Sequence, residues 1–159
     1  MADPGASNRI FLVVVDDTPE LKPALHYACL RARRTAGRVA LLAVIEPADS
    51  QQWMAVEDLM REERRAEAEA LLLRVAEEVH SLSGQAAVFY MREGQVRDEL
   101  LQLIEEDTSI SILVLGAASG PEGPGPLVAH LVNKVAGRLR VPVTIVPGSL
   151  DDAQIAILA

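Results

Sequence analysis

The chain has 159 residues, enough for one domain with a sizeable hydrophobic core. Half of the residues are hydrophobic, but only 3% are aromatic. The core is therefore predicted to consist of Ala, Val, Leu and Ile, which suits helices packed on a β-sheet. The formal net charge is −8 and no long basic run occurs, so we expect no nucleic-acid partner.

The cysteine content and the hydropathy pattern narrow the kinds of site and the cellular locations that we expect for this chain. The single cysteine, Cys29, excludes a disulfide within the chain and a thiol pair for a metal. It lies on an apolar helical stripe and is predicted to be buried. The start, MADPGASNR, lacks the apolar segment of a signal peptide, and no run approaches the ~20 apolar residues that span a bilayer. We expect a soluble cytoplasmic protein with no membrane contact.

The predicted elements begin after residues 1–8, which are small and polar and are predicted to be disordered. Ile10–Val15 predicts a strand, and the following Asp16–Pro19 predicts a turn. A helical pattern then runs to Gly37, with Pro23 in its first turn. The domain is predicted to span 9–148 and to be followed by a tail at 149–159. The rest of the domain is predicted to contain a strand at 39–45, a long helix over about 53–82, a strand at 86–91, a helix over about 96–107, a strand at 112–115, a Gly- and Pro-rich loop at 116–126, a helix and a strand at 141–146.

This alternation of strands and helices predicts an α/β fold. Right-handed crossovers place the strands in one five-stranded parallel sheet with helices on both faces, in the order 3-2-1-4-5. The order reverses between strands one and four, where a doubly wound sheet holds its ligands. Two loops meet there, Asp16–Pro19 and Gly116–Pro126. The sequence therefore predicts a ligand crevice between them.

Several chemistries are excluded by residues that the chain lacks. The pair Asp16-Asp17 is typical of phosphoacceptor receiver domains, but positions 91–93 and 147–148 lack the aspartate and lysine of that chemistry. A flavin site would need stacking aromatics, which the candidate loops lack. No HExxH, CxxC or GxxxxGK[ST] motif occurs, and no serine or cysteine elbow accompanies the histidines, which are His26, His80 and His130. We therefore expect no catalytic residues, no metal and no enzyme; a hydrolase remains an alternative.

Four stretches resemble the universal stress protein family over nearly the whole chain. They are FLVVVDDTPE, LLAVIEP, REGQVRDELLQLIEEDTSISILVLG and VNKVAGRLRVPVTIVPG. The resemblance implies a Rossmann-like domain of the stress response that commonly dimerises through its last strand. In the ATP-binding branch of the family the loop reads Gly-x2-Gly-x9-Gly-Ser/Thr. Glycines let the backbone approach the phosphates, and amides at the helix start donate to them.

The chain departs from this ATP-binding pattern. Gly116 matches the first glycine, but Ser119 occupies the second position and Gly120 comes one residue late. The third pair is Ala129-His130, where Ala129 adds a Cβ. No Lys or Arg lies between Gly116 and His130. Three loop residues lack an N–H that could hold a phosphate, namely Pro121, Pro124 and Pro126.

The nucleoside side of the site is better preserved. The resemblance places Asp16 against the nucleoside and Val44 against the adenine, and Leu115-Gly116 matches the family's exit from strand four. In any such sheet Val44 and Leu115 would also be core residues, and Asp16 could cap its turn. The full set of predicted nucleotide contacts is Asp16, Val44, Leu115, Gly116, Ser119, Gly120, Ala129, His130 and Leu131.

Together these observations predict a universal-stress-type domain that acts as an interaction or regulatory module, with weak or absent ATP binding. A homodimer through strand five, Val143–Val146, and a protein partner are expected. The alternative function is binding of ATP or AMP in the crevice between strands one and four.

Overall fold

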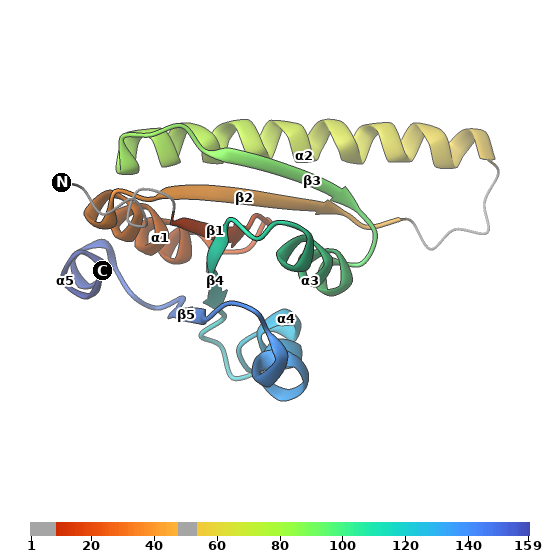
Figure 1. Ribbon diagram of the computed structural model, residues 1–159. Helices are drawn as coiled ribbons and strands as arrows, with labels where there is room; N and C mark the ends of the chain where they lie inside the picture. The colour runs from red at the N-terminus through yellow and green to blue at the C-terminus, as the bar shows by residue number, and fades with distance from the viewer. Residues whose placement is uncertain (1–8, 48–53) are drawn as a thin grey trace.

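The computed structural model describes residues 9–47 and 54–159. Five strands form one parallel sheet in the order β3-β2-β1-β4-β5, which confirms the predicted fold (Figure 1). The predictions for residues 1–8 and for Trp53 lie outside the described residues. The strands are β1 (Ile10–Val14), β2 (Arg38–Ile45), β3 (Val88–Glu93), β4 (Ile110–Ala117) and β5 (Val143–Pro147).

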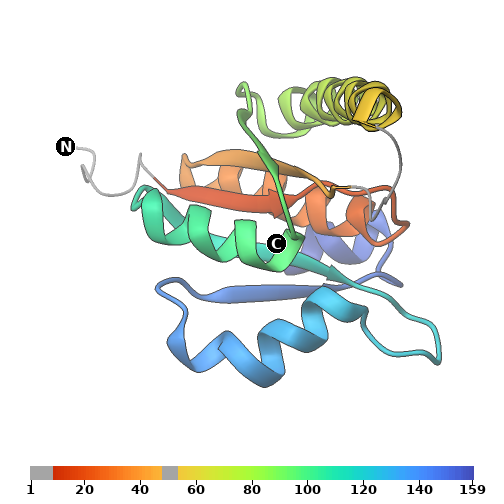
Figure 2. The same cartoon turned by 90° about the vertical axis from the view of Figure 1, so that its right-hand side faces the viewer.

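Helices cover both faces of the sheet (Figures 1 and 2). Helices α1 and α2 pack on one face, and α3 and α4 pack on the other. α2 is the longest helix and extends past the strands (Figure 1). The helices are α1 (Leu21–Thr35), α2 (Met54–Ser83), α3 (Val96–Glu106), α4 (Pro126–His130) and α5 (Asp152–Leu158).

The two core layers follow from the alternation of side chains along the buried strands. In β1, Phe11 and Val13 pack toward α1 and α2, whereas Leu12 and Val14 pack toward α3 and α4. Phe11 is the one aromatic residue among the largest fully buried side chains of the described residues. Cys29 is fully buried on α1, as predicted. Burial, with a smaller contribution from Glu78, raises the pKa of its thiol to about 12.

Several predicted strand boundaries differ from the structure. β3 spans Val88–Glu93 and not 86–91, and the Ala86 carbonyl, just ahead of the strand, accepts from the Arg38 guanidinium at 2.9 Å. β4 is longer at both ends, since Ile110 pairs with β1 and Ala117 pairs with β5. β5 begins after Pro142, whose carbonyl accepts from the Leu113 amide but which has no N–H to donate.

The C-terminal half contains two further irregularities. The helix predicted after the loop is present, but α4 continues as a π-helical turn at Leu131–Val135 and a 3₁₀ turn at Ala136–Arg138. The segment predicted as a tail forms α5, which a capping box of Asp151 and Gln154 begins. α5 lies against α1 (Figure 1), where Arg34 donates to the Ala156 carbonyl at 2.9 Å.

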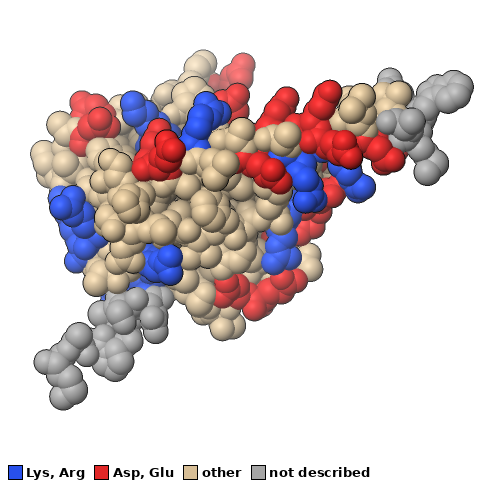
Figure 3. Space-filling model, turned by 90° about the horizontal axis from the view of Figure 1, so that it is seen from above, with Lys and Arg blue, Asp and Glu red and all other residues tan. Residues whose placement is uncertain are grey.

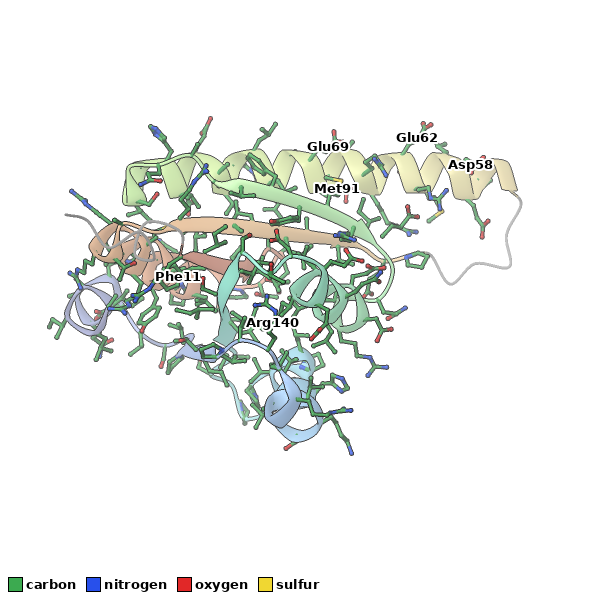
Figure 4. The ribbon with its side chains drawn as sticks, viewed as in Figure 1. Phe11, Asp58, Glu62, Glu69, Met91 and Arg140 are labelled. Atoms are coloured by element: carbon green, nitrogen blue, oxygen red, sulfur yellow. The ribbon has the colours of Figure 1, made fainter. Side chains whose placement is uncertain are left out.

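Arg140 ties the end of α3 to the start of β4. Its guanidinium donates to the carbonyls of Ile104 at 2.7 Å, Asp107 at 3.0 Å and Ile110 at 3.1 Å (Figure 4). The Ile104 carbonyl lies in the last turn of α3, where carbonyls have no intrahelical partner, whereas Asp107 is the C-cap of that helix and Ile110 begins β4. Within 9–47 and 54–159, no helix combines the length and apolar character that crossing a membrane requires.

Candidate functional site

A pocket of about 400 Å³ lies at the carboxyl ends of β1 and β4, at the predicted reversal of strand order. Its walls come from the loop after β1, the start of α1, the start of α3 and the loop that leads into α4. Its volume falls within the ~300–1,000 Å³ typical of small-molecule sites. The lining residues are Val14, Asp16, Thr18, Glu20, Leu21, Ala24, Glu46, Gln95, Val96, Arg97, Leu115, Gly116, Pro124, Gly125, Pro126, Leu127, Val128 and His130.

The buried part of the pocket is apolar. Val14, Leu115 and Val128 are all less than a tenth exposed and belong to the core layer beneath α3 and α4. Ala24 contributes from the first turns of α1. An apolar floor with polar groups at the rim suits a flat, weakly polar ring more than a chain of phosphates.

Carboxylates dominate the rim. Asp16, Glu20 and Glu46 line the pocket, whereas Arg97 is the one Lys or Arg among its described lining residues. Asp16 is exposed overall, but its carboxyl is partly buried. This partial burial is the main cause of the raised pKa of that carboxyl. Hydrogen bonds from Thr18, one at 2.5 Å, oppose this rise, and the charges of Glu20 and Asp17 add to it. The rim therefore repels anions.

The loop after β4 uses several of its own amides internally. The Ala118 amide donates to the Pro124 carbonyl at 3.1 Å, and the Gly123 amide donates to the Gly120 carbonyl at 3.3 Å. At the start of α4, the Ala129 amide donates to the Gly125 carbonyl at 3.0 Å. Together with the three loop prolines, these bonds reduce the number of N–H groups that could hold a phosphate.

Gly116 has a packing reason to be glycine. A Cβ built on Gly116 would lie 2.3 Å from the carbonyl oxygen of Glu20, the N-cap residue of α1. A Cβ built on Gly120 would have no neighbour within 4 Å. The first glycine of the loop therefore permits a close approach of β4 to α1, whether or not a ligand is bound.

The structure brings four of the nine predicted contacts into this pocket. Asp16, Leu115, Gly116 and His130 line it. The other five are not among the lining residues; Ser119 and Gly120 are exposed, and the rest are partly or fully buried, namely Val44, Ala129 and Leu131. All nine stay predicted contacts.

Sequence reasoning missed the contribution of two loops. Gln95 and Arg97 follow β3 and reach the pocket, although no motif pointed to them. Glu46, which follows β2, was also missed. These residues could have been predicted from the topology. The carboxyl ends of all parallel strands lie at the same edge of the sheet, so the residues that follow each strand are candidates for the pocket lining. Among the described residues, no group of three His, Cys, Asp or Glu could hold a metal ion.

Comparisons with known proteins agree with this architecture. The sequence profile described as "Usp: Universal stress protein family" matches residues 7–147. A universal stress protein UspA from Lactobacillus plantarum is 18% identical with a TM-score of 0.73, over 89% of this chain and 99% of that one. A search of curated proteins by sequence finds no match.

Two similar structures contain a nucleotide. A universal stress protein in complex with cAMP is 18% identical with a TM-score of 0.62, over 89% of this chain and 98% of that one. The universal stress protein from Archaeoglobus fulgidus in complex with dAMP is 15% identical with a TM-score of 0.56, over 87% of this chain and 97% of that one. At these identities, the likeness shows the fold alone.

Proposed function

The chain belongs to the universal stress protein family, and from that premise we propose that it is a regulatory module of the stress response that works by association and binds ATP weakly or not at all. The observation that carries this proposal is the charge of the pocket. Asp16, Glu20 and Glu46 surround the place where the family's fold would seat a nucleotide, against one arginine. A triphosphate would meet like charges there.

A nucleoside monophosphate is the second candidate, in the same pocket. The apolar floor suits a base, and Arg97 and His130 at the rim can serve one phosphate group. Two structures with this fold hold cAMP and dAMP, each of which carries a single phosphate. This candidate requires AMP-like ligands to bind more tightly than ATP.

A thermal-shift titration tests both candidates. We expect millimolar ATP with Mg²⁺ to leave the unfolding temperature unchanged. AMP, cAMP or dAMP at ~100 times its dissociation constant should add roughly 2.7 kcal/mol, which is about 5–10 °C for a chain of this length. A clear shift with ATP would refute the proposed function, and no shift with any monophosphate would remove the second candidate.

A substitution that removes one carboxylate from the pocket rim tests whether the charge of the rim weakens nucleotide binding. Glu46→Gln removes one rim carboxylate from an exposed residue, so it should strengthen binding of every phosphate ligand. Glu105→Gln, on the exposed side of α3 and outside the pocket, is the matched control. If both substitutions change nucleotide affinity equally, the local charge of the rim is not the cause.

Association through β5 completes the proposal. β5 is an edge strand, and Ile145 is 38% exposed on it. An edge strand of this kind is a template for pairing with a second copy, so we propose a homodimer through Val143–Val146. Light scattering at micromolar concentration should give twice the monomer mass, and Ile145→Lys should reduce it to the monomer. A wild-type monomer would contradict the dimer.

Enzymatic activity is not part of the proposal. A hydrolase would release phosphate steadily from ATP, and Asp16→Ala would abolish that release. We expect neither release above background nor an effect of the substitution, measured with a phosphate-coupled assay on pure protein.

A further inference from the structure

α2 is buried along only part of its length. The helix spans 30 residues, or about 45 Å, and packs on α1 and β2 before extending beyond the sheet (Figure 1). Among its described residues, the buried hydrophobic ones, Leu72, Val75 and Val79, all lie in its C-terminal half. Between Val56 and Leu71, no described residue is buried. A helix half that packs so little against its own domain has surface available for another molecule.

The outward side of α2 carries an apolar stripe. Leu59, Ala66, Ala70 and Leu73 are 7, 4 and 3 residues apart along the helix, so they lie on one face. All four are exposed, with Leu59 at 57% and Leu73 at 64%. By helical periodicity, this face is opposite the side that packs on the sheet. A stripe of this spacing is typical of a helix that receives a second helix.

Carboxylates flank the stripe. Figure 3 shows acidic side chains gathered over the projecting part of the helix, and in Figure 4 Glu62 and Glu69 point away from the sheet. Within the described parts of the chain, none of the seven exposed carboxylates of α2 forms an ion pair. They are Asp58, Glu62, Glu63, Glu67, Glu69, Glu77 and Glu78.

Two arginines of α2 are engaged with its own domain. Arg61 Nε lies 2.6 Å from Glu93 Oε1 at the end of β3. Arg64 donates to the Glu46 carbonyl at 2.9 Å. Arg65 and Arg74 are the remaining cations of the exposed surface of the helix. The outward face is therefore apolar in the middle and mainly acidic on both sides, with Arg74 on one flank.

We propose that this outward face of α2 docks a basic amphipathic helix of a partner protein. Opposite charge around an apolar seam guides and orients helix packing. A second copy of this chain would bring the same unpaired carboxylates to the contact, and an anionic lipid surface or a nucleic acid would be repelled in the same way. The inference rests on the proposed role in association and specifies the surface and the chemistry of the partner.

The two association surfaces are compatible. α2 packs near the β2–β3 side of the sheet, whereas β5 is the opposite edge. A dimer through β5 would leave both copies of α2 open and would present two acidic faces. A partner with two basic helices would then bind with increased avidity.

A labelled peptide tests the inference directly. The probe is a synthetic helix of about five turns, with leucines at i, i+3 and i+7 and lysines on both flanks, followed by fluorescence anisotropy. We expect saturable binding that weakens with added salt. Glu62→Lys combined with Glu69→Lys should weaken it at least about tenfold. Leu59→Ser combined with Leu73→Ser should weaken it at unchanged net charge.

A matched control separates this surface from overall charge. Glu105→Lys combined with Glu122→Lys changes the net charge equally at exposed positions outside α2, and it should bind the peptide as the wild type does. Equal weakening in the two charge variants would overturn the inference, and so would the absence of binding at about 1 mM peptide. Either result leaves the nucleotide titration and the β5 dimer to be judged separately. Circular dichroism confirms that each variant keeps its helix.

Discussion

Replacing Gly116 with alanine separates a folding role of the β4 loop from a ligand-binding role. The new Cβ would lie 2.3 Å from the Glu20 carbonyl oxygen, where ordinary contacts begin at 3.4 Å. The backbone of either β4 or α1 must therefore move by roughly 1 Å. Because the clash is with a main-chain atom, no rotation of a side chain relieves it.

The magnitude follows from two opposing terms. Overpacking of this kind costs about 1–3 kcal/mol, whereas replacing glycine in the unfolded chain returns about 0.4–1 kcal/mol. We expect Gly116→Ala to lower the free energy of unfolding by up to about 2.6 kcal/mol, or by several degrees in unfolding temperature. Gly120→Ala is the matched variant, since it meets nothing within 4 Å and its φ is not positive.

The assay is urea unfolding of wild type and both variants without nucleotide, followed by circular dichroism. Gly120→Ala should be as stable as the wild type or more stable by about 0.4–1 kcal/mol. Equal stability of the two variants would refute the packing explanation for Gly116. A loss of stability in Gly120→Ala would show that the outer part of the loop is more constrained than its open surroundings indicate.

Three further predictions concern buried or hydrogen-bonded groups. Cys29 is fully buried with its pKa raised to about 12, so a thiol reagent should react with it only after unfolding. Arg140→Ala should cost about 1–3 kcal/mol of unfolding free energy, because three carbonyls lose their hydrogen bonds from the guanidinium, and Arg140→Lys should recover part of it. Hydrogen bonds from Ser109 and then Tyr90 lower the pKa of Asp107. Its stabilising contribution is therefore complete above the unfolded pKa, near 3.9, and is lost as pH falls through the folded value. Asp107→Asn should lower the free energy of unfolding at pH 7 by up to about 1 kcal/mol. It should also reduce the loss of stability as the pH falls, measured by urea unfolding between pH 7 and pH 2.5.

The strand order was predictable because it depends on features that are local in the sequence. Alternating strand and helix patterns allow few connections, and right-handed crossovers reduce them further. The position of the pocket followed from the same argument, so Asp16 and Gly116 were placed correctly at the edge where β1 and β4 end.

The charge of the pocket was not predictable, because it depends on tertiary packing. Glu20 reaches the rim only because α1 begins there, close against Gly116. Glu46 follows β2, and its position depends on how far that strand continues. The start of β3 shows the same limit, because the Ala86 carbonyl ahead of it accepts a hydrogen bond from the side chain of Arg38, which is distant in sequence.

The partial match to the ATP-binding loop has one structural explanation. Gly116 satisfies a packing requirement that exists without a ligand, and the Gly148 amide binds the Ala117 carbonyl at 2.8 Å, which fixes the exit of β4. The amide of Ala118 binds the carbonyl of Pro124 and closes the loop at its base, which keeps its length. Ser119 and Gly120 are exposed beyond that closure, so packing places little constraint on them. In this fold, the first glycine and the loop length can therefore persist without phosphate binding, and only the outer positions carry information about the ligand.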